Sequence, residues 1–242
     1  MSKFSNYEYR KQPEFDMNTF EGANQAIPMK TLVIHCLDPR ADEIPQAVAK
    51  YFGDEVYPGE NMLDESGNLV GHTRTLFTET NAGGRSAFAL ESVAAMDYIF
   101  SVQNVVVVHH SFCGATTLTP ELLIEEFRDH HHADISTMFD HDCLAIMDFE
   151  KSIKYDIELL RSSPAVPKHI KLYGFFYEIS SDKLTEVVRD IPAQIECSGA
   201  TVRCAAAILN GTCSIFVETP GLYCWRLRCW DTGWIPRCWM TR

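Results

Sequence analysis

The sequence predicts an α/β fold with a central, mostly parallel β-sheet flanked by helices. Runs of β-branched and apolar residues, typical of buried strands, occur at 30–36, 104–110 and 169–179. Segments with apolar residues at helical spacing separate these runs. Strands that alternate with helices form parallel sheets, which helices cover on both faces.

The first two helices are each supported by spacing or by an end signal. In 41–52 the apolar residues lie four apart, and Pro45 fits only in the first turn. The next helix follows a glycine turn, begins with Ser86 as its N-cap and continues to about Phe100. Two further helices are predicted at 120–127, which has proline at its first position, and at 149–163.

The remaining segments predict less regular structure. We interpret 55–71, which contains proline and three glycines, as a long loop. We interpret 182–190 as a closing turn or a short strand. The ligands of such a fold bind at the carboxyl edge of the sheet, so residues that directly follow strands are the first candidates for a site.

Composition and charge limit the partners of the protein. The chain has 242 residues, 46% hydrophobic and 22% charged, as expected for a soluble globular protein. The net charge of −12 repels nucleic acid and anionic membranes, so we expect neither as a partner. The N-terminus has no apolar signal core, and no stretch is long enough to cross a bilayer. We therefore expect a cytoplasmic protein with reduced cysteines.

A change of composition near residue 191 predicts three regions: an N-terminal arm at 1–29, a central domain at 30–190 and a tail at 191–242. The tail holds six of the nine cysteines and all four tryptophans. Three interpretations of it remain open: a small zinc-binding or docking appendage, a disordered extension, and a translated segment that was never selected as protein.

Cysteine and histidine residues at two strand ends predict a metal site. Cys36 ends the run at 30–36, and His110 ends the run at 104–110, with Cys113 three residues later. Two thiolates and one imidazole suit Zn²⁺. Three protein ligands leave one tetrahedral position open, as in catalytic zinc sites, where the pKa of a bound water falls to about 7.

Asp38 and Arg40 follow Cys36 directly and have two possible arrangements. Asp38 is either a fourth metal ligand or the partner of Arg40, in which case it orients the reacting water. A Cys–His nucleophilic pair is an alternative, but it leaves Asp38 and Arg40 without a role. A structural zinc site is another, although its usual pair of Cys-rich knuckles is absent.

A histidine-rich run at 128–143 is a second metal candidate. None of its residues has catalytic spacing together with a distant partner, so we interpret it as a solvated helix end and loop. His35 and His109 adjoin the candidate ligands, but the sequence does not place them.

The motifs "CLDPR" at 36–40, "NAGG" at 81–84 and "HHSFCG" at 109–114 together resemble the β-class carbonic anhydrases. The doubled histidine resembles the short-chain branch of the family, and we interpret the chain as a fungal-like member with an atypical tail. The resemblance extends over about residues 30 to 190. It implies the family fold, a zinc lyase that interconverts carbon dioxide and bicarbonate, and a homodimer or higher homo-oligomer.

The resemblance also implies roles for individual residues. Cys36, His110 and Cys113 would bind Zn²⁺, and Asp38 would be either a fourth ligand or the partner of Arg40. The chain departs from the family at Thr80, where arginine is common, and at Phe112, where aspartate is common. These departures leave open a hydrolase of carbon disulfide, of carbonyl sulfide or of a pathway metabolite. A non-catalytic, zinc-stabilised binding protein is a further alternative.

Overall fold

The structure is a computed structural model of the chain. It describes residues 7–16, 29–138 and 144–192, together with the backbone of four short strands after residue 206. The chain divides into two compact units, Met1–Pro192 and Ala193–Arg242.

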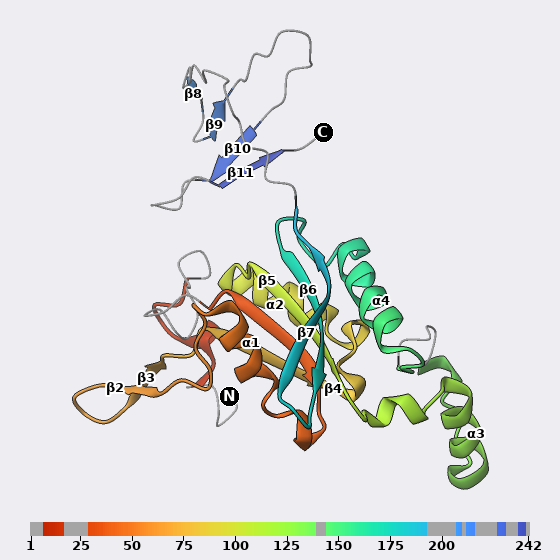
Figure 1. Cartoon of the computed structure of the whole chain (residues 1–242). Coiled ribbons are helices and arrows are strands. Elements are labelled where there is room, and N and C mark those ends of the chain that lie inside the picture. The colour runs from red at the N-terminus through yellow and green to blue at the C-terminus, as the bar shows by residue number, and fades with distance from the viewer. Residues whose placement is uncertain are drawn as a thin grey trace. The chain divides into compact units, whose positions relative to one another are not determined.

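A five-stranded sheet with the order β4-β1-β5-β6-β7 forms the centre of the first unit (Figure 1). The strands are β1 (Thr31–Cys36), β4 (Leu76–Asn81), β5 (Asn104–His110), β6 (Lys171–Glu178) and β7 (Lys183–Asp190). The first four strands in this order run parallel, and β7 runs antiparallel to β6. The predicted α/β fold with a mostly parallel sheet is therefore confirmed.

Helices lie on both faces of this sheet. They are α1 (Ile44–Phe52), α2 (Leu90–Phe100) and α4 (Phe149–Ser162), whereas α3 (Pro120–His131) extends away from the sheet (Figure 1). Helix α1 packs on one face, where Ile44 and Val48 join a buried cluster with Val106 and Val108. Helices α2 and α4 pack on the opposite face.

The core on the α2 and α4 side is equally apolar. Val93 of α2 and Ile157 of α4 pack with Val105 and Val107 of β5. Because successive residues of a strand point to opposite faces, the valines of β5 alternate between the two cores. Each fully buried valine contributes about 1.5–3 kcal/mol to folding, so β5 is the central element that holds both layers.

The interpretation of 55–71 as a loop was wrong in part, and one strand was not predicted. The predicted loop at 55–71 contains a hairpin, β2 (Asn61–Leu63) paired antiparallel with β3 (Leu69–His72). Its strands are short and largely exposed, so they lack the apolar alternation that identifies a strand. Strand β4 was not predicted. It is the edge strand beside β1, and its mixture of polar and apolar residues lacks the continuous apolar run that predicted the other parallel strands.

Ser86 is not the N-cap of α2. It begins a separate 3-10 turn, Ser86–Phe88, and its side chain is buried. Ala89 occupies the cap position of α2 without a side-chain hydrogen bond. The serine is instead positioned by a buried hydrogen bond from its backbone N–H to Asp156, which local sequence does not reveal.

The second unit contains a four-stranded antiparallel sheet in the order β11-β10-β9-β8. Its strands are β8 (Ala207–Leu209), β9 (Thr212–Ile215), β10 (Leu227–Trp230) and β11 (Arg237–Met240). The side chains of this tail, and with them the three interpretations of it, lie outside the described residues. Of the N-terminal arm, the structure describes residues 7–16 and 29.

Across the described part of the chain, no helix combines the length and the apolar character that a membrane span requires.

Candidate metal centre

The carboxyl ends of two adjacent strands bring the three predicted soft ligands together. Cys36 is the last residue of β1 and His110 the last residue of β5, and these strands pair in parallel. Cys113 lies in the loop that follows β5. The ligand atoms of all three residues lie within 4.8 Å of one another. The side chains are buried, with exposed fractions of 5% for Cys36, 0% for His110 and 2% for Cys113.

The hydrogen bonding of His110 leaves one ring nitrogen for a ligand. Its Nδ1 lies 2.9 Å from the carbonyl oxygen of Ser111, which can only accept a hydrogen bond. Nδ1 therefore carries the proton, and Nε2 keeps a free lone pair. That Nε2 atom is buried and has no hydrogen-bond partner. A buried, unpaired acceptor beside two thiols fits a zinc site, because metal-bound histidines commonly donate their other N–H to a carbonyl.

The two thiols interact directly and share their ionisation. Cys113 Sγ donates a hydrogen bond to Cys36 Sγ over 3.8 Å. This bond lowers the pKa of Cys36 to about 4, although burial raises it, and the imidazole of His110 and the backbone N–H groups of Asp38 and Gly83 lower it further. The same contact, together with burial, raises the pKa of Cys113. The pair thus holds one thiolate and one proton, which a divalent cation would displace.

A glycine turn lies close against the end of β1. Gly84 has φ +65°, a conformation that disfavours any residue with a Cβ. A Cβ at this position would lie 2.8 Å from both the Cys36 nitrogen and the His35 carbonyl carbon. The glycine at position 84 therefore allows the "NAGG" turn to pack directly against the backbone of Cys36, a role that the sequence alone did not show.

Asp38 is paired with Arg40 and does not belong to the three-residue cluster. Arg40 Nε donates to Asp38 Oδ1 over 3.0 Å, and Arg40 Nη2 donates to Oδ2 over 2.6 Å. These hydrogen bonds lower the pKa of Asp38 to about 2. Arg40 Nη2 also donates to the Phe112 carbonyl over 3.1 Å, which ties the pair to the loop that carries Cys113. Of the two arrangements predicted for Asp38, the structure has the one in which Asp38 pairs with Arg40.

The two neighbouring histidines point to other partners. The Nδ1 of His35 lies 3.1 Å from the carbonyl oxygen of Cys36, and burial lowers the pKa of His35. The Nε2 of His109 lies 3.0 Å from Asp156 Oδ2, on the opposite side of β5 from His110. Neither histidine belongs to the metal cluster.

Sequence reasoning missed a buried ion pair beside this centre. Arg85 Nε donates to Asp156 Oδ2 over 2.9 Å, and the side chains are 2% and 0% exposed. A signal was present, because Asp156 lies between Ile153 and Ile157 on the apolar stripe of α4. A carboxylate on such a stripe needs a buried partner.

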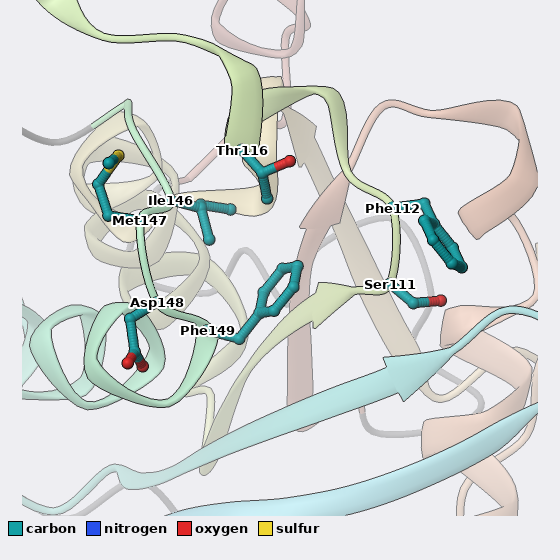
Figure 2. Close-up of a pocket in the computed structure, with 7 residues that line it drawn as sticks. All are labelled: Ser111, Phe112, Thr116, Ile146, Met147, Asp148 and Phe149. Atoms are coloured by element: carbon teal, nitrogen blue, oxygen red, sulfur yellow. The ribbon is translucent and has the colours of Figure 1, made fainter.

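A pocket of about 460 Å³ borders the loop that carries Cys113 (Figure 2). It is lined by Ser111, Phe112, Thr116, Ile146, Met147, Asp148 and Phe149. In Figure 2 the ring of Phe112 points away from the other lining side chains. The Phe112 side chain is 80% exposed. None of the three soft ligands lines this pocket, so it adjoins the metal centre without being part of it.

The histidine-rich run forms the end of α3 and the segment after it. His130, His131 and His132 are exposed, and His130 lies 3.7 Å from Glu126 of the same helix. Within the described residues, Cys36, His110 and Cys113 are the one group that could hold a metal. Residues 139–143 of the run lie outside the described residues.

Comparison with known proteins gives a consistent fold. No protein-family model matches the sequence. The chain is 19% identical over 182 residues to a protein of Bacillus subtilis (strain 168) named "Putative carbonic anhydrase YvdA", and the match covers 69% of this chain and 80% of that protein.

Two solved structures share the architecture. A carbonic anhydrase from Glaciozyma antarctica matches with a TM-score of 0.52 at 22% identity, over 72% of this chain and 88% of that one. A carbonic anhydrase from Streptococcus mutans matches with a TM-score of 0.51 at 25% identity, over 78% of this chain and 99% of that one. The resemblance seen in the sequence is thereby confirmed at the level of the fold.

Proposed function

We propose that this chain, which has the fold of the β-carbonic anhydrases, is a zinc enzyme that catalyses the reversible hydration of carbon dioxide. The reaction joins carbon dioxide and water to give bicarbonate and a proton. One observation carries the proposal: two thiols and an unpaired imidazole nitrogen converge within 4.8 Å in a buried site, beside an Asp–Arg pair.

Cys36, His110 and Cys113 would hold the zinc ion, which would supply Lewis-acid chemistry at neutral pH. The chain itself prepares the three ligands. The carbonyl of Ser111 holds the proton of His110 on Nδ1, and the N–H groups of Asp38 and Gly83 stabilise the thiolate of Cys36. Burial of all three ligands keeps competing water away from them.

Asp38 would orient the reacting water. Its carboxylate has a fixed position because Arg40 contacts both oxygens, and it is ionised at neutral pH because that contact lowers its pKa. A fixed carboxylate accepts a hydrogen bond from water and directs the remaining lone pair at an electrophile. In this role Asp38 is an orienting group, and another base or the buffer removes the proton.

The decisive experiment combines metal analysis with a stopped-flow hydration assay from neutral to alkaline pH. We expect about one zinc ion per chain and measurable hydration. Zinc without hydration at any pH would refute the enzyme and favour a zinc-stabilised binding protein. Folded, reduced protein that takes up no zinc would refute both.

An altered substrate is the second candidate, and Phe112 is the observation that favours it. This large apolar side chain is exposed beside Arg40 at the rim of the site, and Thr80 is also exposed. Hydrolysis of carbonyl sulfide to carbon dioxide and hydrogen sulfide would use the same ligands. Activity on carbonyl sulfide or carbon disulfide, with none on carbon dioxide, would establish this alternative.

We also propose a cytoplasmic homo-oligomer. Large apolar side chains stay exposed on the monomer, including Tyr98 of α2 at 70% and Phe112 at 80%. Contact with a second chain would remove the apolar surface of such side chains from water. Light scattering of the purified protein should give a mass of at least two chains, and a stable monomer would contradict the proposal.

A further inference from the structure

A buried polar network lies directly behind the candidate metal centre. Asp156 of α4 accepts three hydrogen bonds: from Arg85 Nε over 2.9 Å, from His109 Nε2 over 3.0 Å and from the Ser86 N–H over 3.3 Å. Arg85 Nη1 also donates to the carbonyl of Ala145. We call Arg85, Asp156 and His109 the buried triad. All three side chains are at most 2% exposed.

The buried triad connects the parts of the chain that form the metal centre. Arg85 ends the glycine turn, and its backbone N–H and C=O both bond the side chain of Asn81. The same turn places the Gly83 N–H on Cys36 Sγ and packs Gly84 against the backbone of Cys36.

The other two members reach the remaining ligands. His109 immediately precedes His110 on β5, so the bond from His109 to Asp156 anchors the strand end that carries the histidine ligand. The carbonyl of Ala145 adjoins Ile146, whose N–H donates to Ala115 over 3.1 Å, two residues after Cys113. The triad thus contacts the three segments that hold the candidate ligands: the glycine turn beside Cys36, the end of β5 at His110, and the segment at Ala145 that bonds the loop after Cys113.

Stability alone does not account for a charged pair at this position. Desolvation of a buried ion pair offsets most of its attraction, and apolar residues of similar volume are often as stable. The pair does provide fixed geometry, because Arg85 donates from two nitrogens in one plane and Asp156 accepts from two segments of chain, residues 85–86 and His109.

We propose that the buried triad positions the metal ligands, with Arg85 holding the glycine turn against Cys36 and Asp156 holding the strand end at His110. The inference rests on the proposed zinc site but concerns residues that do not touch the metal. Its consequence is that loss of the triad weakens zinc binding by more than general destabilisation explains. Groups behind metal ligands typically change metal affinity about 10–100-fold.

The test is zinc affinity, measured on the full chain by competition with a chromogenic chelator. The variant Arg85→Gln with Asp156→Asn removes both buried charges; the amide at position 156 is isosteric with the carboxylate, and the amide at position 85 is shorter than the guanidinium side chain. We expect zinc binding to weaken about 10–100-fold and the thiolate-to-cobalt absorption band of the Co²⁺-substituted protein to shift. If this variant does not fold, His109→Gln leaves the ion pair intact and should still weaken zinc binding measurably.

The chain offers a matched control in a second Arg–Asp pair that also tethers α4. Arg161 Nε donates to Asp190 of β7 over 2.6 Å from the last turn of the helix, and this pair is partly exposed, with side-chain exposures of 22% and 37%. Arg161→Gln with Asp190→Asn should lower stability and leave zinc affinity unchanged. Unchanged affinity in the triad variant, or equal losses in both, would overturn the inference. Wild-type protein that binds no zinc would instead refute the proposed function, and the inference with it.

Discussion

The two ends of the central sheet both bury polar side chains, but they use them differently. At the amino end, the carboxylate of Glu55 accepts hydrogen bonds from the hydroxyls of Thr31 and Thr75, and Asn104 Nδ2 donates to Thr31 over 2.9 Å. At the carboxyl end, the Nε2 of His110 is buried beside two thiols and has no hydrogen-bond partner.

This difference separates a structural polar cluster from a binding site. A buried polar group without a partner costs about 1–3 kcal/mol, and the Nε2 of His110 differs from other such atoms, such as Nδ1 of His109, in lying beside two thiols. Each of the four residues at the amino end makes at least one hydrogen bond within the chain, and the cluster therefore ties β1, β5 and the residue that precedes β4 together without a ligand. At the carboxyl end, no described residue hydrogen-bonds the Nε2 of His110, and the proposed zinc ion would satisfy this atom.

The largest expected effect is loss of the metal from the carboxyl end. Cys113→Ser replaces a thiolate with a hydroxyl that binds zinc poorly, and the zinc content should fall from about one ion per chain to near zero. Metal analysis of the purified, reduced protein measures it. Glu55→Gln, at the opposite end of the sheet, is the control and should keep its zinc. Full zinc content in the Cys113 variant would remove the distinction between the two ends.

The next effect concerns turnover without metal loss. Arg40→Ala frees Asp38 from both of its side-chain hydrogen bonds and from the loop at Phe112. Zinc content should stay the same and the kcat for hydration should fall by roughly 10²-fold, since a fixed orienting group is lost. Stopped-flow kinetics with parallel metal analysis test this. Wild-type kcat in this variant would exclude the pair from the mechanism.

At the amino end the expected effect is on stability alone. Glu55→Gln replaces a charged acceptor of two hydroxyl hydrogen bonds and should lower the free energy of unfolding by about 1–3 kcal/mol. Urea denaturation measures the change. The neighbouring Asp54→Asn breaks an exposed pair with Lys30, in which Asp54 is 66% exposed, and should change stability by less than about 1 kcal/mol. Equal effects of the two variants would mean that the buried cluster adds nothing.

The smallest effect comes from backbone strain in the loop of the metal centre. Phe112 has φ +56°, in the left-handed region that side chains with a Cβ disfavour. Phe112→Gly should raise the free energy of unfolding by about 1 kcal/mol. Phe112→Ala keeps the Cβ and should bring no such gain, which separates strain from loss of the exposed ring. A gain in the alanine variant equal to that of glycine would assign the effect to the ring.

Much of the fold could be predicted because its signals are local. The runs that became β1, β5 and β6 are continuous and apolar, and α1 and α4 show their buried faces in their spacing. The hairpin of β2 and β3 and the edge strand β4 could not be predicted in this way. Their residues are exposed or mixed, so only pairing with another strand makes them regular.

The residues of the candidate site and its surroundings likewise include some that the sequence predicts and some that it does not. Residue types and spacing were enough to select Cys36, His110 and Cys113 as a candidate group, because two thiols and one imidazole at neighbouring strand ends suit a soft metal ion. The partnership of Arg85 and Asp156 was not predicted, since these residues lie 71 positions apart in the chain and meet only across the packed face of α4.

By itself, the sequence determined the alternation of strands and helices, the likeness to the β-carbonic anhydrases and the set of soft ligands. These properties follow from side-chain chemistry and from periodicity along the chain. The tertiary structure alone decided that Asp38 pairs with Arg40, that His110 keeps a free nitrogen and that a buried triad stands behind the ligands. The physical reason is that a buried polar group bonds to whichever segment packs against it, and tertiary packing, not the neighbouring sequence, determines which segment that is.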